Sequence, residues 1–186
     1  MNIKKIVITG GPGTGKTSII NALKKKDFHC FDEVIRSLTL EVKKDVNETS
    51  HISNPIAFAN DPLDFNTRLL NGRIEQFITA NTLNNKLNFF DRGIPDVLAY
   101  MDYFNQEYDD LFVNACKLHT YSTIFLLPPW KSIYKRDNER FETYEEAVKI
   151  HEHLVNIYIN YGYKIVEVPF GNVEERTNYI INSIKN

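Results

Sequence analysis

The chain has 186 residues, 42% of them hydrophobic, and its 22 Lys and Arg residues nearly balance 24 Asp and Glu residues, which leaves a formal charge of −2. This length is enough for one domain with a substantial apolar core. The balanced charge excludes a general attraction to nucleic acid or acidic membranes, so any polyanion site must be local. Two cysteines are too few for a disulfide scaffold, and no segment is apolar enough for a signal peptide or a membrane span. We therefore expect a cytoplasmic protein.

Short apolar runs alternate with longer amphipathic stretches along the chain. The runs typical of β-strands are Ile6–Thr9, His29–Phe31, Leu87–Phe90, Thr123–Leu127 and Lys164–Val168. The stretches with helical spacing cover residues 17–26, 63–83, 111–118, 144–161 and 173–184. Strands that alternate with helices predict a parallel sheet covered by helices on both faces. Right-handed crossovers then bring the C-terminal ends of the strands to one edge, where such sheets bind ligands.

Several expected helices have recognisable ends. Asp61-Pro62 offers an N-cap followed by proline at the first helical position. Thr143-Tyr-Glu-Glu146 has the pattern of a capping box, and Gly162 is typical of a helix end. Asn172 is the expected start of the last helix.

The segment after the first expected strand is rich in glycine and ends in Lys16-Thr17, which completes the pattern G-x-x-x-x-G-K-[ST]. Glycines let successive backbone N–H groups converge on a phosphate, and the following helix start adds partial positive charge. Lys16 would reach the β- and γ-phosphates, while the Thr17 hydroxyl would coordinate Mg²⁺. The residues that we expect to bind ATP are Gly10, Gly11, Pro12, Gly13, Thr14, Gly15, Lys16, Thr17 and Ser18.

Two acids, Asp32 and Glu33, follow the second expected strand. A carboxylate at this edge could accept the proton of an attacking hydroxyl, as phosphoryl transfer requires. Glu33 is our candidate base, with Asp32 left open, and Arg36 would share its helix face. Ordinary acidity at a helix start, with one ion pair, is the alternative.

Residues 45–61 lack periodicity and are predicted to form a loop, either near the site or as an ordinary surface excursion.

The third expected strand leads into Asp91-Arg92-Gly93. A carboxylate at the tip of this strand could hold Mg²⁺ or a water bound to it. ATP-driven motors commonly carry Glu where Arg92 stands, and an arginine there suits a grip on a phosphate or a polar acceptor. A salt bridge that caps the strand is the alternative interpretation.

Four cations follow the fourth expected strand, at Lys131, Lys135, Arg136 and Arg140. Arg136 and Arg140 are four residues apart, so a helix would present both on one face. Such a segment, at about residues 130–142, could close over a triphosphate and neutralise the transferred phosphoryl group. Asp137 and Glu139 could instead pair with these arginines on an exposed helix.

Together these motifs resemble the kinase-like branch of P-loop nucleotide-binding proteins, in particular a small predicted-ATPase family related to ribosylnicotinamide kinase and to nucleoside and nucleotide kinases. The resemblance is carried by the loop at residues 10–17, Glu33-x-x-Arg36, Phe90-Asp91-Arg92-Gly93, Leu127-Pro-Pro-Trp130, Asp137-x-Glu139-Arg140 and Ile165-Val-Glu-Val-Pro169. It implies a three-layer α/β/α P-loop NTPase fold, with a five-stranded parallel sheet and a short lid, in one domain over residues 1–186. It also implies that the loop at 169–172 lies beside the adenine.

We therefore expect a Mg²⁺-dependent phosphotransferase that moves the γ-phosphate of ATP to a small nucleoside-like acceptor, without nucleic-acid or membrane partners. The candidate catalytic residues are Lys16, Glu33, Asp91, Arg92, Arg136 and Arg140, and the candidate metal ligands are Thr17 and Asp91. One alternative is a nucleotide-gated regulatory protein that hydrolyses ATP slowly and has no small-molecule acceptor. Another is a 5′-end polynucleotide kinase, which would need a basic groove.

Overall fold

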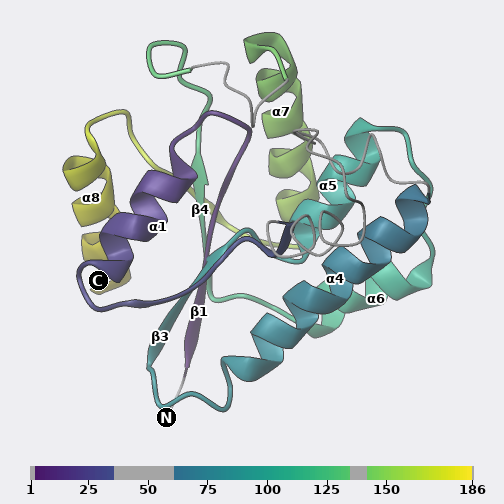
Figure 1. The fold of residues 1–186 in the computed structure, drawn as a ribbon, viewed down its shortest axis with the longest axis horizontal. Helices are drawn as coiled ribbons and strands as arrows, with labels where there is room; N and C mark the ends of the chain where they lie inside the picture. Colours follow the sequence, from purple (N-terminus) through teal and green to yellow (C-terminus); the bar gives the residue numbers. More distant parts are fainter. Residues whose placement is uncertain (1–2, 36–60, 135–141, 186) are drawn as a thin grey trace, which may run out of the picture.

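The computed structural model describes residues 3–35, 61–134 and 142–185. Arg36, Arg136, Arg140 and residues 45–60 of the expected loop lie outside the described residues. The strands are β1 (Lys4–Gly10), β2 (His29–Phe31), β3 (Leu87–Asp91), β4 (Thr123–Leu127) and β5 (Ile165–Glu167). They form a five-stranded sheet in the order β2-β3-β1-β4-β5, in which every pairing is parallel. The predicted parallel sheet is thereby confirmed (Figure 1).

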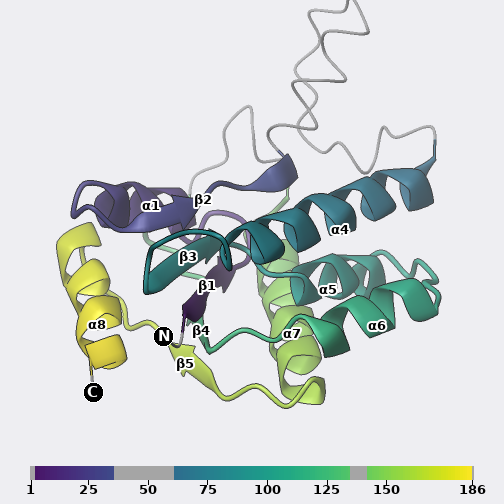
Figure 2. The ribbon, with the colours of Figure 1, turned by 90° about the horizontal axis from the view of Figure 1, so that it is seen from below.

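Helices cover both faces of this sheet, as Figure 2 shows with the sheet seen nearly end-on. One face is covered by α1 (Lys16–Lys24) and α8 (Val173–Lys185). The opposite face is covered by α4 (Pro62–Thr79), α5 (Pro95–Tyr103), α6 (Asp110–Leu118) and α7 (Tyr144–Asn160). The chain therefore has the three-layer α/β/α architecture that its motifs imply.

Burial on both faces explains why the central strands carry runs of consecutive apolar residues. In β1, Ile6 and Ile8 pack in the core beneath α1 and α8, whereas Val7 packs in the core on the other face. Phe89 and Phe90 of β3 divide in the same way. Because successive side chains of a strand point to opposite faces, a stretch that is buried on both faces is apolar at consecutive positions.

The capping residues lie where the sequence places them. Asp61 accepts hydrogen bonds from the backbone N–H groups of the first turn of α4, which has Pro62 in its first turn. Thr143 closes the capping box of α7, and Gly162, with φ 79°, follows the end of that helix. The predicted end of α4 at residue 83 was wrong, because the helix ends at Thr79 and turns follow it.

The parallel register brings the expected functional segments to one edge of the sheet. Ile8 of β1 is level with Asp91 at the end of β3, and Gly10 is level with Leu127 at the end of β4. Since β2 pairs with β3 in the same direction, residues that follow Phe31 also leave at this edge.

None of the helices within the described ranges is long and apolar enough to cross a membrane.

The capping box of α7 gives a test of the fold. Thr143→Ala removes the acceptor of the 3.2 Å hydrogen bond from the Glu146 N–H, so we expect the free energy of unfolding to fall. An N-cap of this kind contributes about 1 kcal/mol, measurable by urea denaturation. Thr143→Ser keeps the hydroxyl and should retain most of the stability. Equal losses in the Ser and Ala variants would contradict a capping role.

Candidate active site

The loop between β1 and α1 is held closely by its surroundings. A Cβ atom on Gly10 would lie 2.5 Å from the carbonyl oxygen of Leu127, and one on Gly11 would lie 2.8 Å from that of Ala147. Gly15, at the N-cap of α1, has φ 89°, a conformation that L side chains rarely adopt. Only glycine fits these positions, so the loop is a preformed cradle of backbone groups at a helix start. That is the geometry that binds phosphate.

Lys16 folds back across this loop. Its Nζ donates hydrogen bonds to the carbonyl oxygens of Gly10 at 2.7 Å and Gly11 at 2.8 Å. Burial, assisted by the nearby Arg92 cation, lowers the pKa of Lys16 to about 7, although Asp91 and other carboxylates counteract it. In the free protein the amine of Lys16 therefore titrates close to neutral pH.

The expected metal ligands come from two different elements at this edge. Asp91 ends β3 and is 5% exposed, and Thr17 is in the first turn of α1. A carboxylate and a hydroxyl are hard oxygen donors of the kind that Mg²⁺ prefers. Within residues 3–35, 61–134 and 142–185, no group of three or more His, Cys, Asp and Glu residues could hold a metal. A Mg²⁺ ion here would thus depend on nucleotide phosphates and water for most of its ligands.

Glu33 is fixed by two arginines. Its Oε2 lies 2.5 Å from Nε of Arg92, and its Oε1 lies 3.0 Å from Nη2 of Arg73 on α4. Its side chain is 10% exposed, whereas that of Asp32 is 70% exposed and pairs with Lys24. The structure therefore brings Glu33, and not Asp32, to the residues that follow β3.

Arg92 joins the acidic residues to the phosphate loop. Its Nη1 lies 3.2 Å from Oδ1 of Asp96 and donates a 3.3 Å hydrogen bond to the carbonyl oxygen of Gly10. The guanidinium also stacks over the ring of Tyr100, 5.0 Å from its centroid. Burial alone would lower the pKa of Arg92, but these neighbours and Glu33 raise it well above its ordinary value. Arg92 therefore stays cationic.

The opposite side of the phosphate loop contacts α8. Arg176 is 3% exposed and donates a 3.0 Å hydrogen bond from Nη1 to the carbonyl oxygen of Thr14. Its guanidinium lies 5.9 Å from the centroid of the Trp130 ring, which stacks on Phe170 at 5.1 Å. Phe170 belongs to the loop expected beside the adenine, and it is 57% exposed. An aromatic pair and a cation thus flank the loop on this side.

The described part of the expected lid also reaches the loop. The ring of Tyr134 packs against Gly13, where a Cβ atom would come within 2.6 Å of it. The Tyr134 hydroxyl donates a hydrogen bond to the carbonyl oxygen of Glu142. Arg136 and Arg140 lie outside the described residues, so their expected role stays a prediction.

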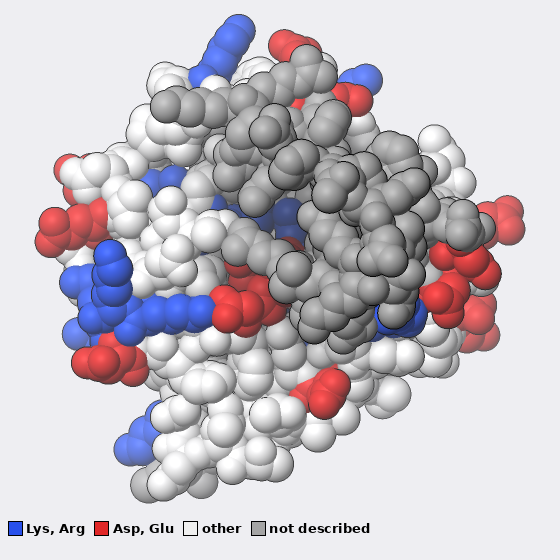
Figure 3. Space-filling model, in the orientation of Figure 1, with Lys and Arg blue, Asp and Glu red and all other residues white. Residues whose placement is uncertain are grey.

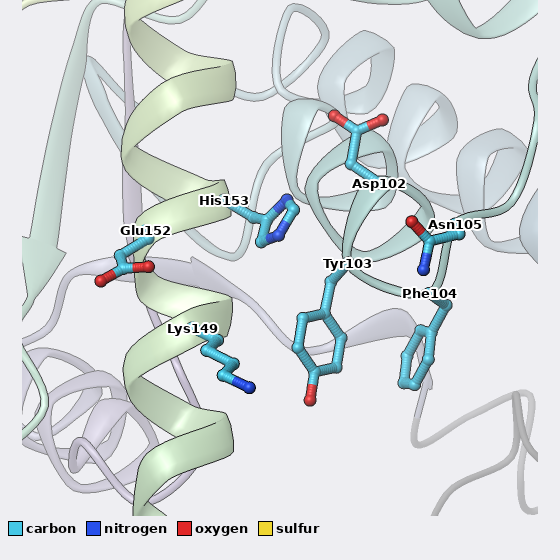
Figure 4. A pocket seen from close by; sticks show the side chains of 7 residues that line it. All are labelled: Asp102, Tyr103, Phe104, Asn105, Lys149, Glu152 and His153. Atoms are coloured by element: carbon cyan, nitrogen blue, oxygen red, sulfur yellow. The ribbon is translucent and has the colours of Figure 1, made fainter.

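A cavity of about 610 Å³ lies between the end of α5 and α7 (Figure 4). Its lining residues are Asp102, Tyr103, Phe104, Asn105, Lys149, Glu152 and His153. Tyr103 is one helical turn beyond Tyr100, which contacts Arg92. Lys149 is in the turn of α7 that follows Ala147, the residue packed against Gly11. The residues that line the cavity include none of those described above around the phosphate loop and Glu33.

Three residues of this site carry no recognisable sequence signal. Arg73, Asp96 and Arg176 are single charged residues within helices, and each is no more than 3% exposed. For Asp96, the only hint is its place in the first turn of α5, where acidic residues are common for helix-dipole reasons.

The face seen in Figure 3 has acidic side chains beside basic ones, so the described residues visible there form no broad basic surface.

The fold and the site define a three-layer α/β protein with a glycine-rich P-loop at the carboxyl edge of its parallel sheet. The chain matches the family model described as AAA domain over residues 5–176, and it belongs to that family. The resemblance inferred from the motifs is thereby confirmed. No curated protein sequence matches the chain.

Similar solved structures include several nucleoside and nucleotide kinases. Deoxyadenosine kinase from M. mycoides, with dCMP and dCDP bound, has a TM-score of 0.68 and 18% identity, covering 97% of this chain and 98% of that one. Thymidylate kinase from Candida albicans has a TM-score of 0.70 and 18% identity, covering 99% and 92%. NadR protein in complex with NR has a TM-score of 0.70 and 18% identity, and covers 98% of this chain. This chain spans 50% of the NadR chain. At such identities the likeness shows the fold.

The environment of Glu33 predicts a difference between two adjacent acids. Glu33→Gln leaves the guanidiniums of Arg73 and Arg92 buried without this carboxylate, so we expect a loss of about 3 kcal/mol in the free energy of unfolding. Asp32→Asn removes an exposed ion pair and should cost less than about 1 kcal/mol. Urea denaturation of both variants measures the difference. Similar small losses would show that Glu33 is not held as a buried partner.

Proposed function

We propose that this protein is an ATP-dependent phosphotransferase that transfers the γ-phosphate to a hydroxyl group of a small nucleoside-like acceptor. The observation that carries the proposal is the Glu33–Arg92 ion pair at the mouth of the phosphate loop. Arg92 contacts both the carboxylate, at 2.5 Å, and the Gly10 carbonyl of the loop, at 3.3 Å. A proton acceptor and a cation are thus connected to the place where phosphates would bind.

In this proposal the donor is bound by the loop at residues 10–18. Backbone N–H groups of the loop would hold the phosphates, and the Lys16 ammonium would exchange its carbonyl partners for phosphate oxygens. Thr17 and Asp91 would hold Mg²⁺, which would neutralise charge on the phosphates when bound. Trp130 and Phe170 would provide an aromatic surface for the base.

The charges on the acceptor side favour a hydroxyl over a phosphate. Among the described residues of this side, the cations Arg73 and Arg92 are matched by Glu33 and Asp96. A phosphate acceptor would bring further negative charge to the Glu33 carboxylate, whereas a neutral hydroxyl can donate its proton to it. Glu33 would accept this proton as the hydroxyl oxygen attacks the γ-phosphate, and Arg92 would stabilise the charge that develops on the phosphoryl oxygens.

Phosphate transfer to a panel of nucleosides and nucleoside monophosphates tests this function. We expect γ-labelled Mg·ATP to label one or more nucleosides and not the corresponding monophosphates. Lys16→Ala should lower the rate by at least about 100-fold, since it removes a cation from the phosphates, while the protein stays folded. Label released only to water would favour a slow regulatory ATPase. Label transferred to monophosphates alone would overturn the hydroxyl assignment.

The lowered pKa of Lys16 predicts proton uptake when ATP binds. Phosphate oxygens favour the charged amine, so binding should raise the pKa of Lys16 from about 7, and the affinity should fall as the pH rises from 7 towards 9. Calorimetry at pH 8 in buffers of different ionisation enthalpy measures the uptake. Lys5→Ala is the control, because Lys5 also has a lowered pKa but lies at the opposite end of β1. If the wild type bound ATP without proton uptake, the result would contradict the expected contact between Lys16 and the phosphates.

A further inference from the structure

Asp96, in the first turn of α5, is a carboxylate with no exposed surface. Its Oδ1 accepts a 2.5 Å hydrogen bond from the hydroxyl of Thr9 and lies 3.2 Å from Nη1 of Arg92. Its Oδ2 accepts a 2.6 Å hydrogen bond from the hydroxyl of Tyr158 and a 2.9 Å bond from the backbone N–H of Gly93. Four donors from β1, the turn after β3 and α7 therefore meet at one side chain.

This arrangement keeps Asp96 ionised. Burial would raise the pKa of Asp96, but Arg92, Arg73 and the hydroxyls of Thr9 and Tyr158 together lower it. A buried ion pair with a satisfied hydrogen-bond shell is often no more stabilising than an apolar core of the same shape. A role in orientation therefore accounts for the charge better than a role in stability.

Asp96 is well placed to orient Arg92. The backbone of Arg92 has φ 74°, an uncommon conformation for a residue with a side chain. Its guanidinium has its Nε against Glu33 and its Nη1 against Asp96 and the Gly10 carbonyl. Asp96 holds one end of the planar group, which leaves the other end directed at Glu33.

We propose that Asp96 is a positioning residue, which, through Arg92, aligns the Glu33 carboxylate with the phosphate loop. The inference rests on the proposed phosphotransferase function and deepens it. Thr9 immediately precedes Gly10, so its bond to Asp96 connects the start of the loop with the acceptor-side ion pair. Disturbing Asp96 should slow transfer without weakening nucleotide binding, because Asp96 lies beneath Arg92 and not on the loop surface.

The experiment uses Thr9 because its variants separate orientation from packing. Thr9→Val keeps the shape but loses the hydroxyl that bonds Asp96, whereas Thr9→Ser keeps the hydroxyl and loses a methyl group. We expect Thr9→Val to lower kcat for transfer by about 10- to 100-fold, with KM for ATP within about threefold, and Thr9→Ser to retain most of the activity. A packing role predicts the opposite order, since only Ser leaves a cavity.

Tyr158 provides a second variant with a matched control. Tyr158→Phe removes a hydroxyl bonded to Asp96 and should also lower kcat selectively. Tyr163→Phe removes a nearby hydroxyl that accepts from the Tyr121 N–H at 3.2 Å, and it should leave kcat unchanged. Equal kcat values for the two variants would overturn the proposal.

An NMR measurement tests whether Asp96 positions Arg92, and it needs no phosphate-accepting substrate. The Nε–H signal of Arg92 in ¹⁵N-arginine-labelled protein, assigned by its loss in Arg92→Lys, reports the ion pair with Glu33. We expect its hydrogen exchange to be at least about tenfold faster in Thr9→Val and Tyr158→Phe, and unchanged in Tyr163→Phe. Unchanged exchange in the first two variants would overturn the proposal. If the wild type labels no acceptor, the proposed function fails, while these exchange rates still decide whether Asp96 positions Arg92.

Discussion

Two guanidiniums and two carboxylates are buried together where the parallel strands end, and the arrangement of the surrounding elements depends on their pairing. Arg73 and Arg92 meet Glu33, and Arg92 meets Asp96. Each charge alone would be very costly to bury, so none of the elements that supply them can shift independently. The segment after β2, helix α4, the turn after β3 and helix α5 are thereby fixed relative to one another.

The phosphate loop is tied to the same cluster through backbone oxygens. Lys16 and Arg92 both donate to the carbonyl of Gly10, so a cation from α1 and a cation from the turn after β3 converge on one peptide group. On the other side, Arg176 holds the carbonyl of Thr14. Backbone carbonyls are poor partners for a phosphate but good ones for a cation, so these bonds keep the cations close to the loop.

The sequence predicts the parts of this site that depend on local backbone chemistry. The glycine-rich loop needs positive φ angles and packs closely against neighbouring backbone and side chains, and the short pattern G-x-x-x-x-G-K-[ST] reflects both requirements. The choice between Asp32 and Glu33 could not be made locally, because it depends on Arg73, which lies 40 residues further along the chain. Arg176 was missed for the same reason, since its partner Thr14 is 162 residues away. Tertiary partners of single charged residues leave no periodic pattern.

The segment from residue 91 to residue 96 combines most of these constraints. Arg92 turns back over the loop with φ 74°, and Gly93 must follow it because a Cβ atom there would lie 2.6 Å from the Tyr158 hydroxyl. That hydroxyl needs the space to reach Asp96. Pro95, in the first turn of α5, starts the helix that carries Asp96 back under Arg92. The glycine, the proline and Asp96 thus act together to fix the position of one arginine, and the three lie within this single turn and the helix start that follows it.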